Sequence, residues 1–263
     1  MKKELKKLIE SKGLKTYGDL VMIDGELFPL PLVKGNSKIG ANVWHASTLP
    51  TNKEIKIKVG DEYITYKGTC PMTCEGCYAC KGNYKYNAIK YVLMMRTRLL
   101  REHMDIYFYL VWAQIQVESI KLLRVHASGD FVPNEPKGWK KIFESFPNLK
   151  GWTYTKFEIK DDIKELNEVK NFNIVDSIIK GCGFNFGHID YILNVYEKLK
   201  NDGKQVYICR CGIDKNQHCE TCGGCANNEN VLFIEHSTEY KALKDPLFPT
   251  IKELIESQPK QEL

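Results

Sequence analysis

Four cysteines lie within eleven residues of the segment TCPMTCEGCYAC, residues 69–80, which we call the cysteine hook. Cys70, Cys74 and Cys77 are separated by three and then two residues, and Cys80 follows. Thiolates bind zinc or iron–sulfur clusters, and a structural zinc site commonly takes cysteine pairs from separate segments. Three thiolates on one loop can instead hold three irons of a 4Fe–4S cluster and leave one iron open to a ligand. The spacing therefore predicts an open cluster, which Cys80 would close if it supplied a fourth ligand.

A second cysteine group occupies CRCGIDKNQHCETCGGC, residues 209–225. Cys211, Cys219, Cys222 and Cys225 suffice for a complete tetrahedral or cubane site, with Cys209 as a spare ligand or an alternative to Cys211. We expect a metal here and leave zinc and iron–sulfur as alternatives. The isolated Cys182 is interpreted as a small buried residue.

The composition is that of a globular protein with a core. The chain has 263 residues, 43% hydrophobic and 27% charged, and a formal charge of +5. It contains no signal-like segment and nothing near the ~18 consecutive apolar residues of a membrane span, so we expect a cytoplasmic protein with no membrane partner. In a reducing compartment, clustered cysteines are more often metal ligands than disulfides. The mild charge, with no basic–aromatic stripe, does not support a nucleic-acid partner but leaves one open.

Strands and helices alternate after the hook. A hairpin is predicted at 54–68. Buried strands are predicted at 121–128, 149–156, 172–180, 204–209 and 230–237, and helices at 86–103, 105–119, 135–146, 160–169, 186–203 and 249–257. This order predicts an α/β fold, a partial (β/α)6-type barrel or open parallel sheet, with a C-terminal cysteine-rich metal-binding segment. The expected divisions are an N-terminal extension at 1–53, the α/β barrel with the cluster loop at 54–208 and the cysteine-rich segment with the last strand and helix at 209–263.

Several polar residues follow predicted strand ends, where α/β proteins bind ligands. Gly129 would let a ligand approach the backbone, and Asp130 offers a carboxylate to an ammonium group. His126 and Lys156 are the candidate catalytic residues. Burial of His126 in the core, and a capping or solvent role for Lys156, are the alternatives.

The hook with Tyr78 resembles the cluster loop of the radical S-adenosylmethionine (SAM) superfamily. Within it, the closer resemblance is to a branch found in phages and mobile elements, through Cys77-Tyr78-Ala79, the Arg124–Phe131 strand end and Tyr154-Thr155-Lys156. The resemblance implies a partial barrel, a 4Fe–4S cluster on Cys70, Cys74 and Cys77, and SAM bound at the open iron. Tyr78, Ser128, Gly129 and Asp130 would then be cofactor-binding residues. Ser128 and Asp130 replace the Gly and Glu common in the superfamily, and Gly76 stands where an aromatic residue is common.

The leading hypothesis is thus an iron–sulfur enzyme that reductively cleaves SAM to start radical chemistry, with a reductant such as flavodoxin or ferredoxin. The alternatives are a zinc-stabilised binding module without catalysis, with nucleic acid as one partner to test, and an iron–sulfur redox protein. No residue pattern in the chain distinguishes a peptide, nucleic-acid or small-molecule substrate.

Overall fold

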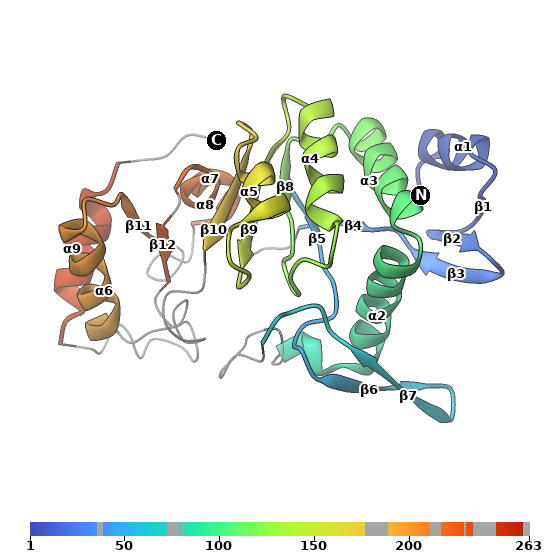
Figure 1. Ribbon diagram of the computed structural model, residues 1–263, viewed down its shortest axis with the longest axis horizontal. Helices are drawn as coiled ribbons and strands as arrows, with labels where there is room; N and C mark the ends of the chain where they lie inside the picture. The colour runs from blue at the N-terminus through green and yellow to red at the C-terminus, as the bar shows by residue number, and fades with distance from the viewer. Residues whose placement is uncertain are drawn as a thin grey trace.

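A five-stranded mixed sheet lies at the centre of the protein (Figure 1). The computed structural model describes residues 1–35, 39–72, 79, 82–176, 189–210, 217–228, 230–233 and 246–259. The strand order is β10-β9-β8-β5-β4. The strands are β4 (Leu32–Lys34), β5 (Val43–Ala46), β8 (Leu122–Arg124), β9 (Lys150–Thr155) and β10 (Phe172–Asp176). β5, β8, β9 and β10 are mutually parallel, and β4 is an antiparallel edge strand.

The mixed α/β class is as expected, and no closed barrel is formed by the residues that the structure describes. The composition of the sheet differs from the prediction, because β4 and β5 come from the segment expected to be an N-terminal extension. Pairing of β5 with β8 brings that segment into the central sheet.

Alternation of side chains along the strands gives the sheet two different faces. On β9, Gly151 faces the helical side, where a Cβ atom would lie 2.2 Å from the Phe143 ring. Its neighbour Trp152 faces the opposite side and packs in a separate core with Val43 and Val175. The central sheet therefore separates a large helical core from a smaller core that contains cysteines.

Helices cover the first face. They are α2 (Asn87–Glu102), α3 (Met104–Glu118), α4 (Glu135–Ser145) and α5 (Asp161–Asn167). Trp139 and Phe143 of α4 are fully buried against this face. Beyond α2 and α3 lies an N-terminal unit of α1 (Lys3–Ser11) and the antiparallel strands β1 (Lys15–Tyr17), β2 (Leu20–Ile23) and β3 (Glu26–Pro29). Figure 1 shows this unit at the opposite end of the molecule from the C-terminal elements.

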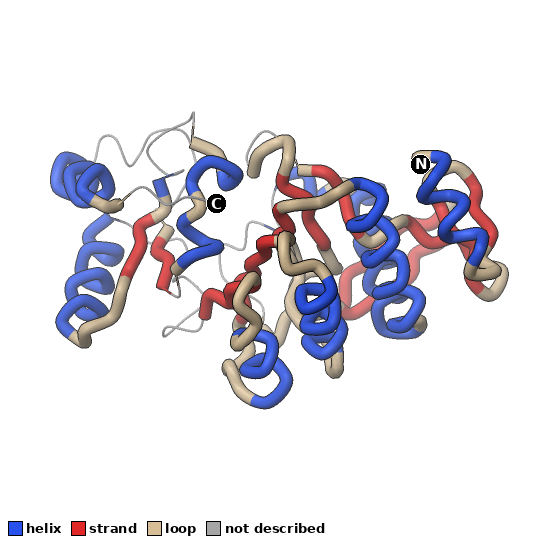
Figure 2. The backbone as a smooth tube through the Cα atoms, turned by 90° about the horizontal axis from the view of Figure 1, so that it is seen from above, coloured by secondary structure: helices blue, strands red, loops and turns tan. Residues whose placement is uncertain are grey.

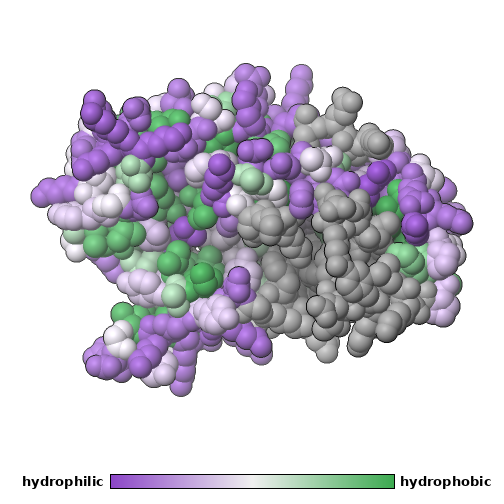
Figure 3. Space-filling model, turned by 180° about the vertical axis from the view of Figure 1, so that it is seen from behind, coloured by the Kyte–Doolittle hydropathy of each residue, from purple (hydrophilic) through white to green (hydrophobic). Residues whose placement is uncertain are grey.

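The predicted hairpin is present as β6 (Glu54–Val59) and β7 (Glu62–Lys67), an isolated two-stranded sheet. It is followed by a short 3-10 helix, η2 (Gly82–Lys85). The hairpin projects from the body below α2, and its surface is mostly hydrophilic when seen from behind (Figure 3). The hook thus follows β7, the second strand of this hairpin.

The C-terminal part forms a further layer. Its elements are α6 (Ile189–Asn201), β11 (Val206–Ile208), α7 (Cys219–Cys222), α8 (Gly224–Asn227), β12 (Asn230–Leu232) and α9 (Phe248–Ser257). β11 and β12 pair in parallel as a separate sheet instead of extending the central one. Figure 2 shows α6 and α9 next to this small sheet, and their apolar residues form a third core with Ile208 and Leu232.

Among the described residues, no helix is both long and apolar enough to cross a membrane.

Candidate functional site

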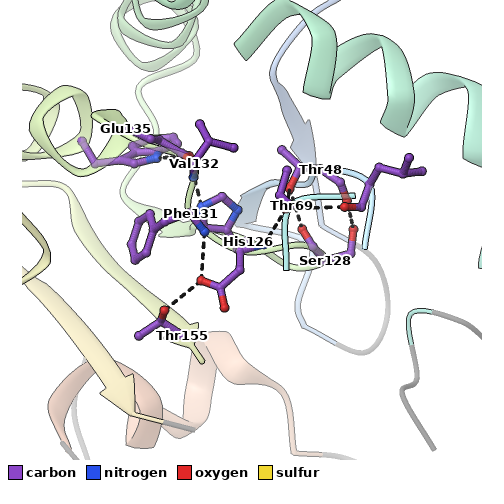
Figure 4. A network of polar contacts seen from close by, with 11 residues as sticks. Thr48, Thr69, His126, Ser128, Phe131, Val132, Glu135 and Thr155 are labelled. Atoms are coloured by element: carbon purple, nitrogen blue, oxygen red, sulfur yellow. Dashed lines mark hydrogen bonds and ion pairs between the residues drawn. The ribbon is translucent and has the colours of Figure 1, made fainter. Parts of the chain in front are cut away.

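Three strand ends and the start of the hook meet in one buried polar network (Figure 4). Thr48 follows β5, Asp130 follows β8, and Thr155 ends β9. Thr69, directly before Cys70, joins them: its Oγ1 lies 2.9 Å from Thr48 Oγ1 and accepts a 2.8 Å hydrogen bond from the Asp130 backbone N–H. We call this side of the central sheet, where the parallel strands end, the carboxyl edge.

The Asp130 carboxylate connects two of these strand ends. Its Oδ1 accepts hydrogen bonds from the Phe131 N–H at 2.9 Å and from Thr155 Oγ1 at 2.8 Å. Its Oδ2 accepts a 2.8 Å bond from the Lys156 N–H. The residue is only 2% exposed. Burial raises the pKa of Asp130, while His126 and the three donors act in the opposite direction.

Gly129 is required by the close approach of the threonines. Its φ is +84°, and a Cβ atom would lie 1.9 Å from Thr48 Oγ1 and 2.6 Å from Thr69 Oγ1. Ser128 strengthens the same contact, because its hydroxyl donates to the Thr48 carbonyl at 2.8 Å and the Thr48 N–H donates to its carbonyl at 3.0 Å. The space beside Gly129 is therefore filled by Thr48 and Thr69 of the protein itself, whereas we expected Gly129 to let a ligand approach.

The base of the hook is held at this edge although it belongs to the hairpin connection. The Thr69 N–H donates to the Leu49 carbonyl at 2.9 Å. Arg101 of α2 donates to the carbonyls of Lys67 and Gly68, both at 2.8 Å. The chain thus reaches Cys70 in a fixed position, and Cys70 is half-buried. The other predicted hook residues, Cys74, Cys77, Tyr78 and Cys80, lie outside the described residues.

His126 lies inside the protein. Its Nε2 is 3.0 Å from Oε1 of Glu135, which is fully buried. Burial alone would lower the pKa of His126, but the Glu135 carboxylate raises it above its ordinary value. Glu135 also accepts hydrogen bonds from the Val132 N–H at 2.9 Å and from Trp139 Nε1 at 2.8 Å. The His126–Glu135 pair fixes the loop after β8. This arrangement corresponds to the alternative in which His126 is buried in the core.

Lys156 contributes its backbone N–H to Asp130, and its side chain is half-buried. Cys182 lies in a part of the chain that the structure does not describe. The catalytic roles proposed for His126 and Lys156 remain predictions.

Four cysteines line one small cavity of about 10 Å³ on the face of the sheet opposite the helices. They are Cys209, Cys219, Cys222 and Cys225, and Trp152 of β9 lines the same cavity. We call it the cysteine cavity. Cys209 directly follows β11, and its N–H donates to the Leu232 carbonyl at 2.7 Å. The structure thus places Cys209 with the last three cysteines, while Cys211 lies outside the described residues.

Backbone geometry brings the last three cysteines together. Gly223, between α7 and α8, has a φ of +65°, which turns the chain so that both short helices face the cavity. Asn173 of β10 fastens this turn to the sheet by donating to the carbonyls of Cys225 and Asn228, both at 2.8 Å. On the outer side, Glu220 accepts a 2.9 Å bond from the Asn42 N–H, just before β5.

The electrostatics of the cysteine cavity suit a bound cation. Burial, followed by the proximity of Cys209, Cys219 and Cys222, raises the pKa of the Cys225 thiol. A metal ion would reverse this effect, because it stabilises thiolates. Trp152, only 1% exposed, has an indole N–H without a hydrogen-bond partner among the described residues. Such a donor would suit a thiolate or sulfide acceptor.

As the side chains are arranged, no three His, Cys, Asp or Glu residues in the described ranges are grouped to hold a metal ion. The donor set nevertheless fits one, since four soft sulfur ligands surround a single cavity. Rotation of the thiols into the cavity would be needed for ligation.

Sequence reasoning missed two residues that define these sites. Glu135 reads as an ordinary first-turn helix acid, and only the fold shows that it is buried below the loop. The sequence suggests only a core role for Trp152. A buried indole N–H needs a hydrogen-bond acceptor, however, and this need could have pointed to a site beside Trp152.

The fold and site define an α/β protein with a threonine–aspartate network at the carboxyl edge of its sheet and a four-cysteine cavity on one face. The family model described as Gene product 88 matches residues 30–228, and the chain belongs to that family. Our assignment to the radical SAM superfamily is therefore wrong, because the family model that matches is Gene product 88. No curated protein and no solved structure matches the chain.

Proposed function

We propose that the protein is an iron–sulfur enzyme with two thiolate centres. The hook cysteines Cys70, Cys74 and Cys77 would hold a cluster with one open iron at the carboxyl edge. The C-terminal cysteines would hold a second, closed centre. The observation that carries this proposal is the attachment of Thr69 to Thr48 and Asp130, since it places the base of a three-cysteine loop where parallel sheets bind ligands.

The chemistry expected of an open iron is transfer of one electron to a bound ligand, and SAM is the first ligand to test because reductive cleavage would start radical chemistry on a substrate. The chain's own residues have positioning roles in this proposal. Thr69, Gly129 and Asp130 hold the start of the hook at the strand ends, and Arg101 holds the residues that lead to it. A small reductant of the flavodoxin or ferredoxin class would supply the electron.

The second centre is supported by the cysteine cavity. Four thiolates complete a zinc or 4Fe–4S site without an open position. Cys209 directly follows β11, and the other three cysteines belong to α7 and α8, so a bound metal would tie the small sheet to the turn that Asn173 fastens to β10. We propose a structural role for this centre.

A zinc-stabilised binding module is the second candidate. It is favoured by the small volume of the cysteine cavity, which suits a single ion better than a cubane. In this alternative the hook would also hold zinc, with Cys80 as the fourth ligand, and the protein would carry out no redox chemistry.

The deciding experiment is an anaerobic count of iron, sulfide and zinc with a visible spectrum. It uses the wild-type chain and the matched variants Cys74→Ala and Cys222→Ala. The proposal expects Cys74→Ala to lose roughly four irons and four sulfides and to keep the metal of the second centre, and Cys222→Ala to lose only the metal of the second centre. It also expects formation of 5′-deoxyadenosine from SAM under reduction by the wild type. Zinc alone, with no sulfide after reconstitution, would overturn it and favour the binding module.

A further inference from the structure

A second cavity, of about 450 Å³, lies between the loop after β8 and the loop after β9. We call it the β8–β9 pocket. Its volume is within the range of small-molecule sites, and its position beyond the carboxyl ends of two parallel strands is where α/β folds bind ligands. From its lining we infer that it binds a small molecule with a flat apolar body and a cationic amine.

The apolar part of the pocket is substantial. Phe131, Val132 and Pro136 contribute buried side chains on the β8 side. Phe157 and Ile163, both half-buried, contribute from the β9 side. Two aromatic rings on facing loops favour a flat ligand, because stacked or edge-on ring contacts add to the free energy of apolar burial.

Both walls are fixed before any ligand binds. Asp130 accepts bonds from the N–H groups of Phe131 on one wall and Lys156 at the start of the other. The Val132 N–H is held by Glu135, and the Phe157 N–H donates to Thr155 Oγ1 at 3.0 Å. The pocket is thus preorganised, which reduces the entropy cost of binding.

The charges at the rim favour a cation. Glu158, Asp161 and Asp162 line the pocket with a single basic residue, Lys160. Lys160 pairs with Glu158 at 3.1 Å, and Asp162 pairs with Lys137 at 3.2 Å. Asp161 has no ion-pair partner within the described ranges. It is held at a φ of +48°, a conformation that Asp and Asn tolerate better than most residues.

The pocket is joined to the hook through one short path. Phe131 follows Asp130, whose N–H binds Thr69, the neighbour of Cys70. If the proposed iron–sulfur function is correct, this pocket is the site for its substrate, and the substrate class is an apolar amine. The binding inference itself does not depend on the cluster.

The test is a binding titration of the full-length chain, without reconstitution, followed by the ¹³C-methyl resonance of Ile163. Three probes share one apolar body and differ in charge: 2-phenylethylamine, 3-phenylpropionate and 2-phenylethanol. We expect the chemical-shift change of the Ile163 methyl resonance to be largest with the amine and smallest with the carboxylate. The Ile163→Val variant assigns the resonance.

Asp161→Asn removes the rim charge while keeping a residue that tolerates the backbone conformation. It should weaken binding of the amine about fivefold and leave binding of the alcohol unchanged. The matched control is Asp190→Asn, which removes an exposed acid on α6 and should change the affinity for neither probe. Equal binding of amine and carboxylate, no response of Ile163, or no effect of Asp161→Asn would overturn the inference. Because no metal is needed, failure here is distinguishable from failure of the iron and sulfide count.

Discussion

Replacing Gly129 with alanine should disrupt the carboxyl edge more than any ordinary glycine substitution. The new Cβ would lie 1.9 Å from Thr48 Oγ1 and 2.6 Å from Thr69 Oγ1. Neither threonine can move freely, because Thr48 is fully buried and Thr69 is 5% exposed. Their hydroxyls also bond to each other and, from Thr69, to the Asp130 N–H.

The expected loss has three parts. An alanine at φ +84° costs about 1–2 kcal/mol in backbone strain. Overpacking a buried site adds about 1–3 kcal/mol. Displacement of the threonine hydroxyls weakens hydrogen bonds that contribute about 1 kcal/mol each. We therefore expect Gly129→Ala to lower the free energy of unfolding by about 3–6 kcal/mol.

Gly13→Ala is a matched control, because Gly13 also has a positive φ, +86°, but has no atom within 4 Å of its Cβ position. Gly13→Ala should lower the free energy of unfolding only through this backbone strain, by about 1–2 kcal/mol. Urea unfolding of both variants, followed by circular dichroism, measures the difference. If Gly129→Ala lowers the free energy of unfolding no more than Gly13→Ala does, the close contact of Thr48 and Thr69 with the loop after β8 is refuted.

Three other substitutions test neighbouring groups. Burial, then Arg124 and Arg96, lowers the pKa of His45 to about 4, so its contribution is present above pH 6.5 and is lost as the pH falls toward 4. Between pH 7 and 4.5, wild type should therefore lose about 2 kcal/mol more unfolding free energy than His45→Asn in urea titrations. Glu135→Gln should lower the free energy of unfolding by about 3 kcal/mol in the same urea titration. It should also lower the pKa of His126, which NMR can follow. An unchanged pKa of His126 would contradict its pairing with Glu135. Trp152→Phe should destabilise the metal-free protein only modestly, because removal of a buried donor without a partner among the described residues offsets part of the cost of the cavity that the smaller ring leaves. It should weaken metal retention in a chelator competition, and equal retention would contradict the indole's proposed role.

The parts of the fold that could be predicted were those with local periodicity. The buried strand predicted at 149–156 is β9, and the alternating segment around the Gly-Asp turn at 60–61 forms β6 and β7. The strand predicted at 121–128 was too long: β8 ends at Arg124, and His126 has a φ of +54° that extended strands do not allow. Apolar content alone does not reveal such a bend.

The membership of the central sheet depended on pairing between distant segments. β4 and β5 are three and four residues long, too short to show a period, and β5 acquires its place by pairing with β8. Similarly, spacing could not choose between Cys209 and Cys211. The β11–β12 pairing decides where Cys209 lies, since its N–H binds Leu232 directly after the ladder.

The motif at Ser128–Asp130 illustrates the same limit for function. A glycine and a carboxylate at a strand end suit an ammonium ligand, but here they hold Thr69 and the β9 end, a role that leaves no separate sequence pattern. Because Asp130 lies between Thr69 of the hook and Phe131 of the β8–β9 pocket, this one network positions both proposed sites. Gly129→Ala should therefore reduce iron retention at the hook and amine binding in the pocket together. Asp161→Asn should affect the pocket alone and Cys222→Ala neither, so the three variants separate a shared structural support from the chemistry of each site.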